Sequence, residues 1–364
     1  MTNPTAAARD DPRATLTALY RAALEAVAPG PALARALDDE PDLDPRRRVW
    51  ILALGKAAQP MAAAAVAALR ARGTEPAGGL VVAPEPVAPP HPAIEVAVGD
   101  HPEPGARSLD AAARLARVAE RVRPEDEAWV CISGGATSLI AAPVPGVSPD
   151  DLARLHRLLL GSGLDIHAMN AVRKRVSRWG AGRLALALAP ARVRAFLLSD
   201  VPGDDPAAIA SGPCAPDKRT AAEARALLSS AALWTRLPES VRTAIAAAEA
   251  DPSLETPKPD HPAFRRVTTR IIAGNRTALE AAAAHARALG LATTVALEPL
   301  QGEAAEAGRR VAATLLNNSQ AAGTQRSPGV SICVVWGGET VVTLGSGPAG
   351  RGGRCQELAL AAAE

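Results

Sequence analysis

Short apolar runs alternate with helical stretches along the first half of the chain, and this alternation is the strongest constraint on the fold. Each run is a continuous apolar block rather than an in-out alternation, as strands buried on both faces require. The sequence therefore predicts an α/β fold with a parallel sheet covered by helices on both sides. The predicted strands are 49–54, 79–83, 94–98, 128–132 and 193–198, and the helices between and around them include 13–38, 57–72, 106–121, 148–160 and 165–189.

The rest of the chain predicts a second domain, because 364 residues exceed one ordinary core. A polar, proline-rich segment, 251–262, is the best linker candidate. The predicted elements beyond it are strands at 269–273 and 291–297, helices at 276–289 and 302–316, and a hairpin of 329–336 and 340–344 around 337–339. A last helix begins at Arg354 and reaches Glu364 while still apolar, so we expect a truncated chain or one completed by something else.

Composition excludes several classes of protein. A net charge of +2 gives no field for nucleic acid or an anionic membrane. No apolar run reaches the roughly 20 residues that a membrane helix needs, and the N-terminus lacks the apolar core of a signal peptide. The four cysteines are far apart with no CxxC pair, so neither a zinc site nor a disulfide framework is indicated. A cytoplasmic protein with small-molecule partners, and with neither nucleic acid nor membrane, is expected.

The loop 199–213 follows the fifth predicted strand and contains three aspartates, Asp200, Asp204 and Asp205. Ligands of α/β proteins bind at the carboxyl ends of parallel strands. Close aspartates would repel one another in a packed core, so they are solvated, metal-bound or facing a cationic ligand. An ordinary surface turn is the alternative, since Pro, Gly and Asp are common turn residues.

Two further strand ends carry anion-binding features. Ser133-Gly134-Gly135 is followed by Thr137 and Ser138, and paired glycines with successive N–H groups can surround an anion. It is neither a Walker A loop nor GxGxxG, and a tight strand exit is the alternative. Gly55-Lys56 places a scarce lysine at the same edge, where we expect it to be partly buried and suited to phosphate or carboxylate.

Three weaker patterns complete the set of candidate residues. His101, in the turn 99–102, is a candidate base or a solvated turn histidine. Asn170, Arg173 and Lys174 begin a helix with donors suited to an anion, unless this is simply a capped basic helix. The segment 350–357 places Arg351 and Arg354 among glycines before a helix, which favours a phosphate clamp over a solvent loop.

The order of the motifs over residues 50–364 resembles that of the glycerate 2-kinase family with a C-terminal MOFRL domain. The motifs are GKAA, GDHPxP, SGGATS, NAVRK, LSDVPGDDPxxIASGP, GN, GGET and GRGGRxQELAL. The resemblance implies a Rossmann-like domain, 1–255, and a smaller α/β MOFRL domain, 256–364. ATP, Mg²⁺ and D-glycerate would meet in the cleft between them. This chain departs from the family at Ala136–Ser138, where the family has SGGGSAL, and at Cys355, where it has asparagine. The family's TDGxDGPTDAAG segment after the QELAL helix does not occur here.

The resemblance also implies roles for individual residues. Lys56 and Arg351 match catalytic positions and would neutralise phosphate, as phosphoryl transfer requires. Asp200 would orient the attacking hydroxyl, while Asp200, Asp204 and Glu339 are alternative Mg²⁺ ligands. Arg173 or Lys174 would hold the substrate carboxylate. The predicted substrate- or phosphate-binding residues are Ser133, Gly134, Gly135, Thr137, Ser138, Asn170, Arg173, Lys174 and Arg354.

Two rival functions stay open at this point. A hydroxypyruvate reductase, a name often attached to this family, would need a nicotinamide site, yet Gly55 is not part of a GxGxxG motif. A truncated paralogue would bind a small acid or a nucleotide without turnover. A homodimer is also kept open.

Overall fold

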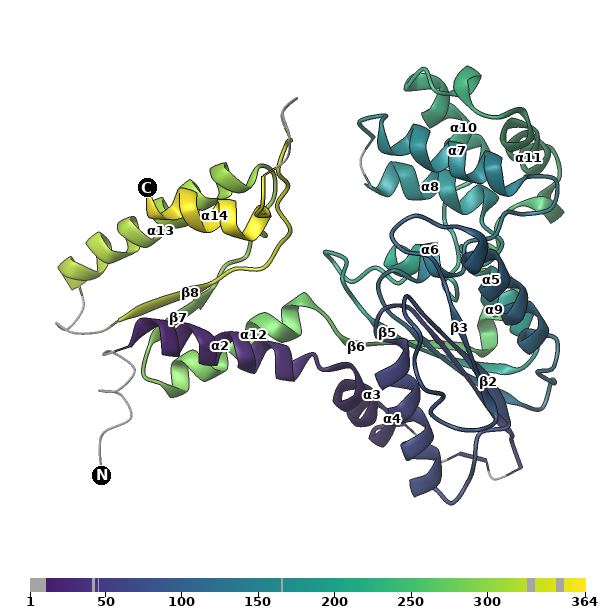
Figure 1. The fold of residues 1–364 in the computed structure, drawn as a ribbon, viewed down its shortest axis with the longest axis horizontal. Coiled ribbons are helices and arrows are strands. Elements are labelled where there is room, and N and C mark those ends of the chain that lie inside the picture. The colour runs from purple at the N-terminus through teal and green to yellow at the C-terminus, as the bar shows by residue number, and fades with distance from the viewer. Residues whose placement is uncertain (1–10, 41–42, 45, 165, 326–330, 345–349) are drawn as a thin grey trace. The chain divides into compact units, whose positions relative to one another are not determined.

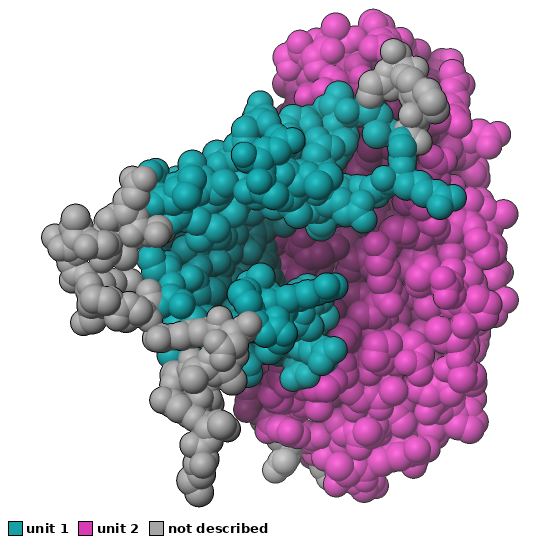
Figure 2. All heavy atoms as spheres, turned by 60° about the vertical axis from the view of Figure 1, so that its left-hand side comes forward, with its two compact units in different colours: residues 1–28, 273–364 teal, residues 29–272 magenta. Residues whose placement is uncertain are grey.

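The computed structural model describes residues 11–40, 43–44, 46–164, 166–325, 331–344 and 350–364. The chain divides into two compact units, which Figure 2 colours separately. Unit 1 combines residues 1–28 with 273–364, and unit 2 comprises residues 29–272. The predicted domain boundary after residue 255, and the MOFRL assignment of the second domain, stay predictions.

Unit 2 is built on a six-stranded sheet with the order β3-β2-β1-β4-β5-β6 (Figure 1). β2 pairs in parallel with β3 and β1, and β4 pairs in parallel with β1 and β5. Every residue of β1, β2 and β4 is buried, as their continuous apolar sequences predict. The predicted α/β fold class is therefore confirmed. The strands are β1 (Val49–Leu54), β2 (Gly78–Ala83), β3 (Ile94–Val98), β4 (Glu127–Ile132), β5 (Arg192–Leu198) and β6 (Val267–Ala273).

Helices cover both faces of this sheet, because successive strand residues point to opposite sides. Ile51 packs in one core with residues of α3 (Pro29–Asp38) and α4 (Ala58–Ala71). Leu52 packs in the other core with residues of α5 (Ala106–Ala119) and α9 (Arg183–Leu188). Figure 1 shows these two helical layers on either side of the strands.

A helical cluster with its own apolar core is formed by two helices that follow β4 in the chain and two that follow β5 (Figure 1). Leu155, Val172, Leu228 and Val241 lie in this core, one from each of its four helices. The four are α7 (Pro149–Leu160), α8 (Ile166–Val176), α10 (Ala221–Ser230) and α11 (Glu239–Ala250), and the shorter segments of unit 2 are α6 (Ala136–Leu139), η1 (Ile209–Ser211), η2 (Trp234–Arg236), η3 (Pro252–Leu254) and η4 (Pro262–Arg266).

Two predicted helices are each divided in the structure. The predicted helix 165–189 is broken between α8 and α9, where Ala181 and Gly182 have φ of 56° and 81°. A Cβ on Gly182 would lie 2.5 Å from the Phe264 ring, so the close packing of η4 requires glycine there. The predicted helix 13–38 ends at Ala26 and restarts at Pro29, whose missing N–H suits a first helical position.

The predicted linker, 251–262, packs within unit 2 instead of spanning freely. The Glu255 carboxylate accepts a hydrogen bond from Ala221 N at 2.6 Å and forms an ion pair with Arg175. Thr256 is buried, and Asp217 N donates to Pro257 O at 3.0 Å. Its polar composition reflects these hydrogen bonds rather than a flexible connection.

Unit 1 contains a two-stranded parallel sheet, β7 (Ala292–Val295) with β8 (Ile332–Val335). Its helices are α2 (Pro12–Ala26), which packs on α12 (Asn275–Ala288), and α13 (Ala304–Gln325), which packs on α14 (Arg354–Ala363). No helix in the described parts of the chain is both long and apolar enough to cross a membrane.

The predicted hairpin around 337–339 is wrong. After β8 the chain does not fold back onto that strand, but forms parallel bridges from Gly338 to Leu300 and from Val341 to Glu303. Leu300 N donates to Gly337 O at 2.8 Å, so the segment before α13 takes the backbone hydrogen bonds that a hairpin would have made. Residues 329–330, part of the predicted first strand, and 345–349, after the second, lie outside the described residues.

Candidate active site

The carboxyl ends of β1 and β4 bring two of the predicted loops into direct contact. Lys56 N donates to Gly134 O at 3.0 Å, and Ala57 N donates to the Ser133 hydroxyl at 3.0 Å. Gly55 has φ of 122°, and a Cβ there would lie 2.3 Å from Ser133 Oγ. Glycine is therefore required at the end of β1, and the Gly55-Lys56 and Ser133–Ser138 segments form one structural unit.

Gly134 and Gly135 bring three functional side chains to this edge. A Cβ on Gly134 would lie 2.0 Å from Asp200 Oδ2, so the carboxylate of the β5 loop rests against the backbone at this glycine. A Cβ on Gly135 would lie 3.0 Å from His101 Cδ2 and 3.3 Å from Lys56 Cγ. The two missing side chains thus make room for Asp200 at one glycine and for His101 and Lys56 at the next.

Lys56 is exposed, so the expectation that it is partly buried is wrong. Gly55 is the buried residue of the pair, and the Lys56 side chain passes Gly135 and ends in solvent. Asp200 is also exposed. A cation and a carboxylate are therefore both available to a ligand at the carboxyl edge of the sheet.

His101 adds a titratable group to the same edge. Burial lowers the pKa of its imidazole, and the positive charge of Lys56 lowers it further. The ring is therefore held mainly neutral near pH 7, where one nitrogen can donate and the other accept a hydrogen bond. The sequence left open whether His101 is a candidate base or a solvated turn histidine. Its contact with Gly135 places it beside Lys56 in the candidate site.

The hydroxyl groups of the Ser133–Ser138 segment are engaged within the protein. The Ser133 side chain is buried and accepts from Ala57 N, while Ser138 Oγ donates to Gly135 O at 3.0 Å. Thr137 Oγ1 lies 3.1 Å from Ser211 Oγ, which ties this segment to the loop 199–213. These bonds explain how the two loops are held together, and ligand binding by the hydroxyls stays a prediction.

A hollow of about 280 Å³ lies between α8 and the segments around Asp205 and Asp217. We call it the α8 hollow. Asn170 and Lys174 line it together because residues four apart share one face of a helix. Three of its charged residues, Asp217, Lys218 and Arg219, were not predicted as site residues from the sequence. The scarcity of lysine in this chain could have pointed to Lys218. The full lining is Asn170, Ala171, Lys174, Asp205, Ala207, Ala208, Asp217, Lys218 and Arg219.

Lys174 is the buried cation of the α8 hollow. Burial lowers the pKa of its ammonium group to about 8, although the charge of Asp205 acts in the opposite direction. Its Nζ lies 3.8 Å from Asp217 Oδ1. A buried amine with so low a pKa gains more from an incoming anion than an exposed lysine would.

Arg173 does not line the α8 hollow, although it neighbours Lys174 in sequence. Its Nε is buried and has no hydrogen-bond partner among the described residues. Burial, and then the charge of Arg173, lower the pKa of His156 on α7 to about 4. The structure therefore favours Lys174 over Arg173 as the anion ligand of this hollow.

The predicted site residues of unit 1 form their own ion pair. Arg354 Nη2 lies 2.7 Å from Glu339 Oε1, and both side chains are exposed. The predicted phosphate ligand and the predicted metal ligand therefore neutralise each other. Arg351 is exposed. Its joint action with Lys56 would involve both units and stays a prediction.

The described residues include no group of three or more His, Cys, Asp or Glu side chains placed to hold a metal ion. Mg²⁺ commonly uses only one or two carboxylates together with substrate phosphates and water. The exposed Asp200 carboxylate has the chemistry for such a partial ligand set. Mg²⁺ binding, with Asp200, Asp204 or Glu339 as ligand, stays a prediction.

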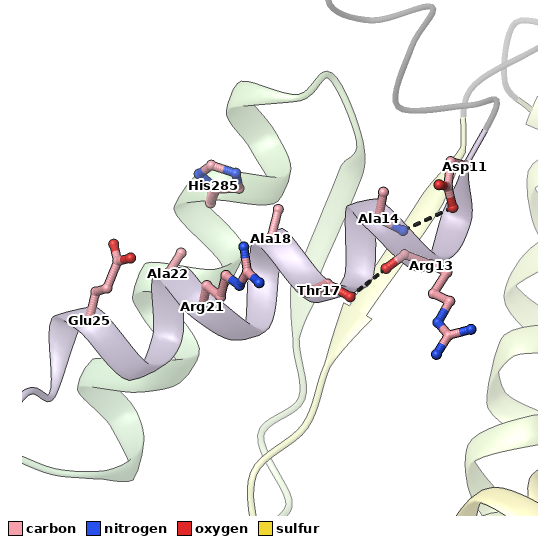
Figure 3. Close-up of a pocket in the computed structure, with 9 residues that line it drawn as sticks. All are labelled: Asp11, Arg13, Ala14, Thr17, Ala18, Arg21, Ala22, Glu25 and His285. Atoms are coloured by element: carbon pink, nitrogen blue, oxygen red, sulfur yellow. Dashed lines mark hydrogen bonds between the residues drawn. The ribbon is translucent and has the colours of Figure 1, made fainter.

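Another hollow, of about 510 Å³, lies along α2 in unit 1 (Figure 3). Figure 3 shows His285 contributed by α12 beside this helix. Asp11 and Glu25 balance Arg13 and Arg21 in its lining, and the remainder is mainly alanine. This charge balance gives no preference for phosphate, and we assign no site to it.

Comparison with known proteins gives one family match and several similar relatives. Residues 15–246 match a family described as a domain of unknown function, DUF4147. A relative from Agrobacterium vitis, provisionally named hydroxypyruvate reductase, is 36% identical over 96% of this chain and 76% of its own length. Glycerate 2-kinase of Pyrococcus horikoshii is 33% identical over 94% of this chain and 74% of its own.

Solved structures show the same fold. The crystal structure of glycerate kinase from Thermotoga maritima has a TM-score of 0.81 and 32% identity, covering 96% of this chain and 78% of the other. A protein from Pyrococcus horikoshii OT3 has a TM-score of 0.77 and 32% identity, covering 97% of this chain and 80% of the other.

Proposed function

Because the chain belongs to the DUF4147 family and is similar to glycerate kinases over most of its length, we propose that it phosphorylates D-glycerate on the 2-hydroxyl with ATP. The observation that carries the proposal is the meeting of Lys56, His101 and Asp200 at Gly134-Gly135. This places a cation, a neutral imidazole and a carboxylate at the sheet edge where α/β proteins bind ligands. A cytoplasmic location stays part of the proposal.

In the proposed reaction the 2-hydroxyl oxygen of glycerate attacks the γ-phosphorus of ATP. A new P–O bond forms, the bond to the β,γ-bridging oxygen breaks, and ADP leaves. The hydroxyl proton passes to the Asp200 carboxylate or to water. Positioning and charge neutralisation contribute most of the rate in such transfers, because little covalent chemistry falls to the protein.

Lys56 neutralises negative charge on the transferring phosphoryl group. Its backbone is fixed by the bond from Lys56 N to Gly134 O, while its side chain reaches solvent beside Gly135. A lysine with a fixed backbone and an ammonium group that extends into solvent is suited to bind a phosphate that arrives from solvent. Gly134 and Gly135 permit this arrangement, because a Cβ at the first would displace Asp200 and a Cβ at the second would displace His101 and Lys56.

Lys174 in the α8 hollow is proposed to hold the substrate carboxylate. A volume of about 280 Å³ exceeds what a three-carbon acid needs, and Asn170 offers an amide donor from the same helix face. Binding of a carboxylate would raise the pKa of Lys174 from about 8, so glycerate binding near pH 8 takes up a fraction of a proton, at most about one half.

Mg²⁺ and the arginines of unit 1 complete the proposal. Mg²⁺, when bound with ATP, would neutralise charge on the phosphates, and Asp200 or Asp204 would hold it. Arg351, with Arg354 in support, would supply guanidinium groups for phosphate.

A three-armed assay tests the proposed function. We expect purified protein to convert D-glycerate to 2-phosphoglycerate only when ATP is present. Oxidation of NADH with hydroxypyruvate in the absence of ATP would favour the reductase. Calorimetric binding of glycerate and a non-hydrolysable ATP analogue without product would favour a non-catalytic protein.

The matched variants in this assay are Asp200→Asn and Asp110→Asn, which remove one exposed carboxylate each from unit 2. Asp200 rests against Gly134, whereas Asp110 pairs with Arg114 on the exposed side of α5. We expect a loss of turnover from Asp200→Asn that is at least about tenfold larger than from Asp110→Asn. Equal losses would remove Asp200 from its proposed role.

A further inference from the structure

An arginine-lined hollow lies at the edge of the unit 2 sheet opposite the candidate active site. It has a volume of about 360 Å³. We call it the arginine hollow. Arg47 precedes β1, Arg192 and Arg194 are the first and third residues of β5, and Thr268 is the second residue of β6. The complete lining is Glu40, Arg47, Arg192, Arg194, Arg265, Arg266 and Thr268.

The position of the hollow follows from the parallel sheet. Strands that run in parallel bring their amino ends to one edge and their carboxyl ends to the other, so Arg192 and Lys56 lie at opposite edges. A strand of six residues such as β1 spans roughly 20 Å. A ligand in the arginine hollow is therefore separate from a substrate beside Gly134-Gly135.

One arginine of the hollow is committed to the protein. Arg194 is buried, with its Nε 2.7 Å from Glu127 Oε1 and its Nη1 2.9 Å from Glu40 Oε2. The Glu127 side chain is itself buried and also accepts from Trp129 Nε1 at 2.8 Å. This network pairs Glu40, the acidic residue of the lining, and anchors Arg194 in the wall of the cavity through the buried Glu127.

Three of the remaining arginines carry charge that the protein does not neutralise locally, whereas Arg47 Nε lies 3.8 Å from Asp44 Oδ2. Within the part of the chain that the structure describes, Arg192, Arg265 and Arg266 form no ion pair, and all three are exposed. Arg266 Nη1 is positioned by a hydrogen bond to Pro190 O at 2.9 Å, and Arg47 Nη1 by one to Glu125 O at 3.0 Å. A backbone carbonyl therefore orients Arg266 without cancelling its charge, while Arg47 keeps its ion pair with Asp44.

From this geometry we propose that the arginine hollow binds a small phosphate-bearing anion with at least two negative groups. Guanidinium groups bind phosphate oxygens in a bidentate manner, and several of them around one concave site suit a diphosphate more than a single carboxylate. The shared chemistry is a phosphate or diphosphate group, which a nucleotide or a phosphorylated metabolite could carry. The proposal does not depend on the identity of the reaction at the other edge.

Calorimetry with pyrophosphate tests the proposal in full-length protein carrying Lys56→Ala, which weakens phosphate binding at the carboxyl edge. We expect Arg192→Gln/Arg265→Gln to weaken pyrophosphate binding at least about tenfold, because two charge-assisted contacts are lost. The control, Arg114→Gln/Arg154→Gln, removes two charges from exposed helix ion pairs of the same unit and should leave affinity unchanged.

Thermal melts verify that each variant is folded, and Arg192→Lys/Arg265→Lys retains the charge while losing the planar fork. Equal pyrophosphate affinity in both double glutamine variants would overturn the proposal, as would an absence of binding in the Lys56→Ala protein. Titrations with ADP separate the sources. Because ADP also binds the proposed active site, only the affinity that Arg192→Gln/Arg265→Gln removes from the Lys56→Ala protein is assigned to the arginine hollow. A larger loss for ADP than for pyrophosphate supports a nucleotide, and the reverse supports a phosphorylated metabolite.

Discussion

The two edges of the unit 2 sheet achieve positive charge in different ways. The carboxyl edge combines glycines with one exposed lysine, and its loops are joined by backbone hydrogen bonds such as Lys56 N to Gly134 O. The amino edge is built from arginines on the strand starts, and one of them, Arg194, is buried in an ion-pair network. The carboxyl edge leaves room for a reacting ligand, whereas the amino edge combines stability with anion attraction.

The largest expected effect is on stability at the amino edge. Arg194→Met leaves the buried Glu127 carboxylate without its cation, which should lower the free energy of unfolding by about 3–5 kcal/mol. Denaturant titration measures this change. The double variant Arg194→Met/Glu127→Gln removes the orphaned charge and should recover much of the loss. A double variant no more stable than Arg194→Met would contradict the network.

The next effect is on catalysis at the carboxyl edge. Lys56→Ala should lower kcat by roughly a hundred- to a thousandfold, the usual cost of removing a transition-state charge contact. Lys56→Arg should not restore it fully, because a guanidinium group differs in reach and geometry. Arg192→Gln, at the other edge, should leave kcat unchanged. Near-normal turnover in Lys56→Ala, or equal losses of kcat in Lys56→Ala and Arg192→Gln, would contradict the assignment of catalysis to the carboxyl edge alone.

A smaller effect on catalysis is expected when the Asp200 carboxylate is displaced but not removed. Gly134→Ala adds a Cβ that would lie 2.0 Å from Asp200 Oδ2, so the carboxylate must move. Because Asp200 is exposed, the shift should cost little stability but lower kcat by about tenfold or more. The control is Gly161→Ala, where the nearest atom is 3.7 Å away and φ is −86°. Unchanged kcat in Gly134→Ala would separate Asp200 from the reaction.

The last expected effect is a pH dependence of stability that originates in the α8 hollow. The pKa of Lys174 is lowered to about 8 in the folded protein, so the unfolded chain binds more protons from about pH 8 up to its ordinary pKa of 10.5. Stability should therefore rise with pH in that window, by up to about 1.4 kcal/mol per pH unit from this group. Asp205, Asp217, Arg175 and Arg219 are the charged neighbours that modulate it.

Chemical denaturation at pH 8, 9 and 10 measures this slope in wild type and in Lys174→Met. The slope should be reduced in Lys174→Met and retained in Lys218→Met, which alters an exposed lysine of the same hollow. An identical pH dependence in all three proteins would mean that Lys174 does not titrate differently in the folded state.

The sequence predicted the architecture of unit 2 because continuous apolar strands have no alternative burial. It also predicted that Lys56, Ser133 and Asp200 share one edge, since each follows a parallel strand. It did not predict the broken helix before Gly182 or the parallel bridge at Val341, because both depend on distant partners, the Phe264 ring and Glu303. The exposure of Lys56 was missed for a related reason, since the path of its side chain depends on Gly135, which is 79 residues away in the sequence.

The arginine hollow could not be found from the sequence either. Its residues come from before β1, from β5 and from η4, and no local motif joins them. The sequence gives 40 basic residues, of which Lys56, Lys174, Lys218 and Lys258 are the lysines, so arginine pairs such as Arg265-Arg266 are common in it. Only the sheet topology separates these arginines from the rest.

The most direct measurement of the central claim is ³¹P NMR of the wild-type protein with D-glycerate, ATP and Mg²⁺. The account predicts a phosphomonoester signal of 2-phosphoglycerate that grows in equal amount with ADP, and that is nearly absent with Lys56→Ala under the same conditions. ADP and inorganic phosphate without a phosphoglycerate signal, or the same product rate with Lys56→Ala, would contradict phosphoryl transfer to glycerate at the carboxyl edge of this sheet.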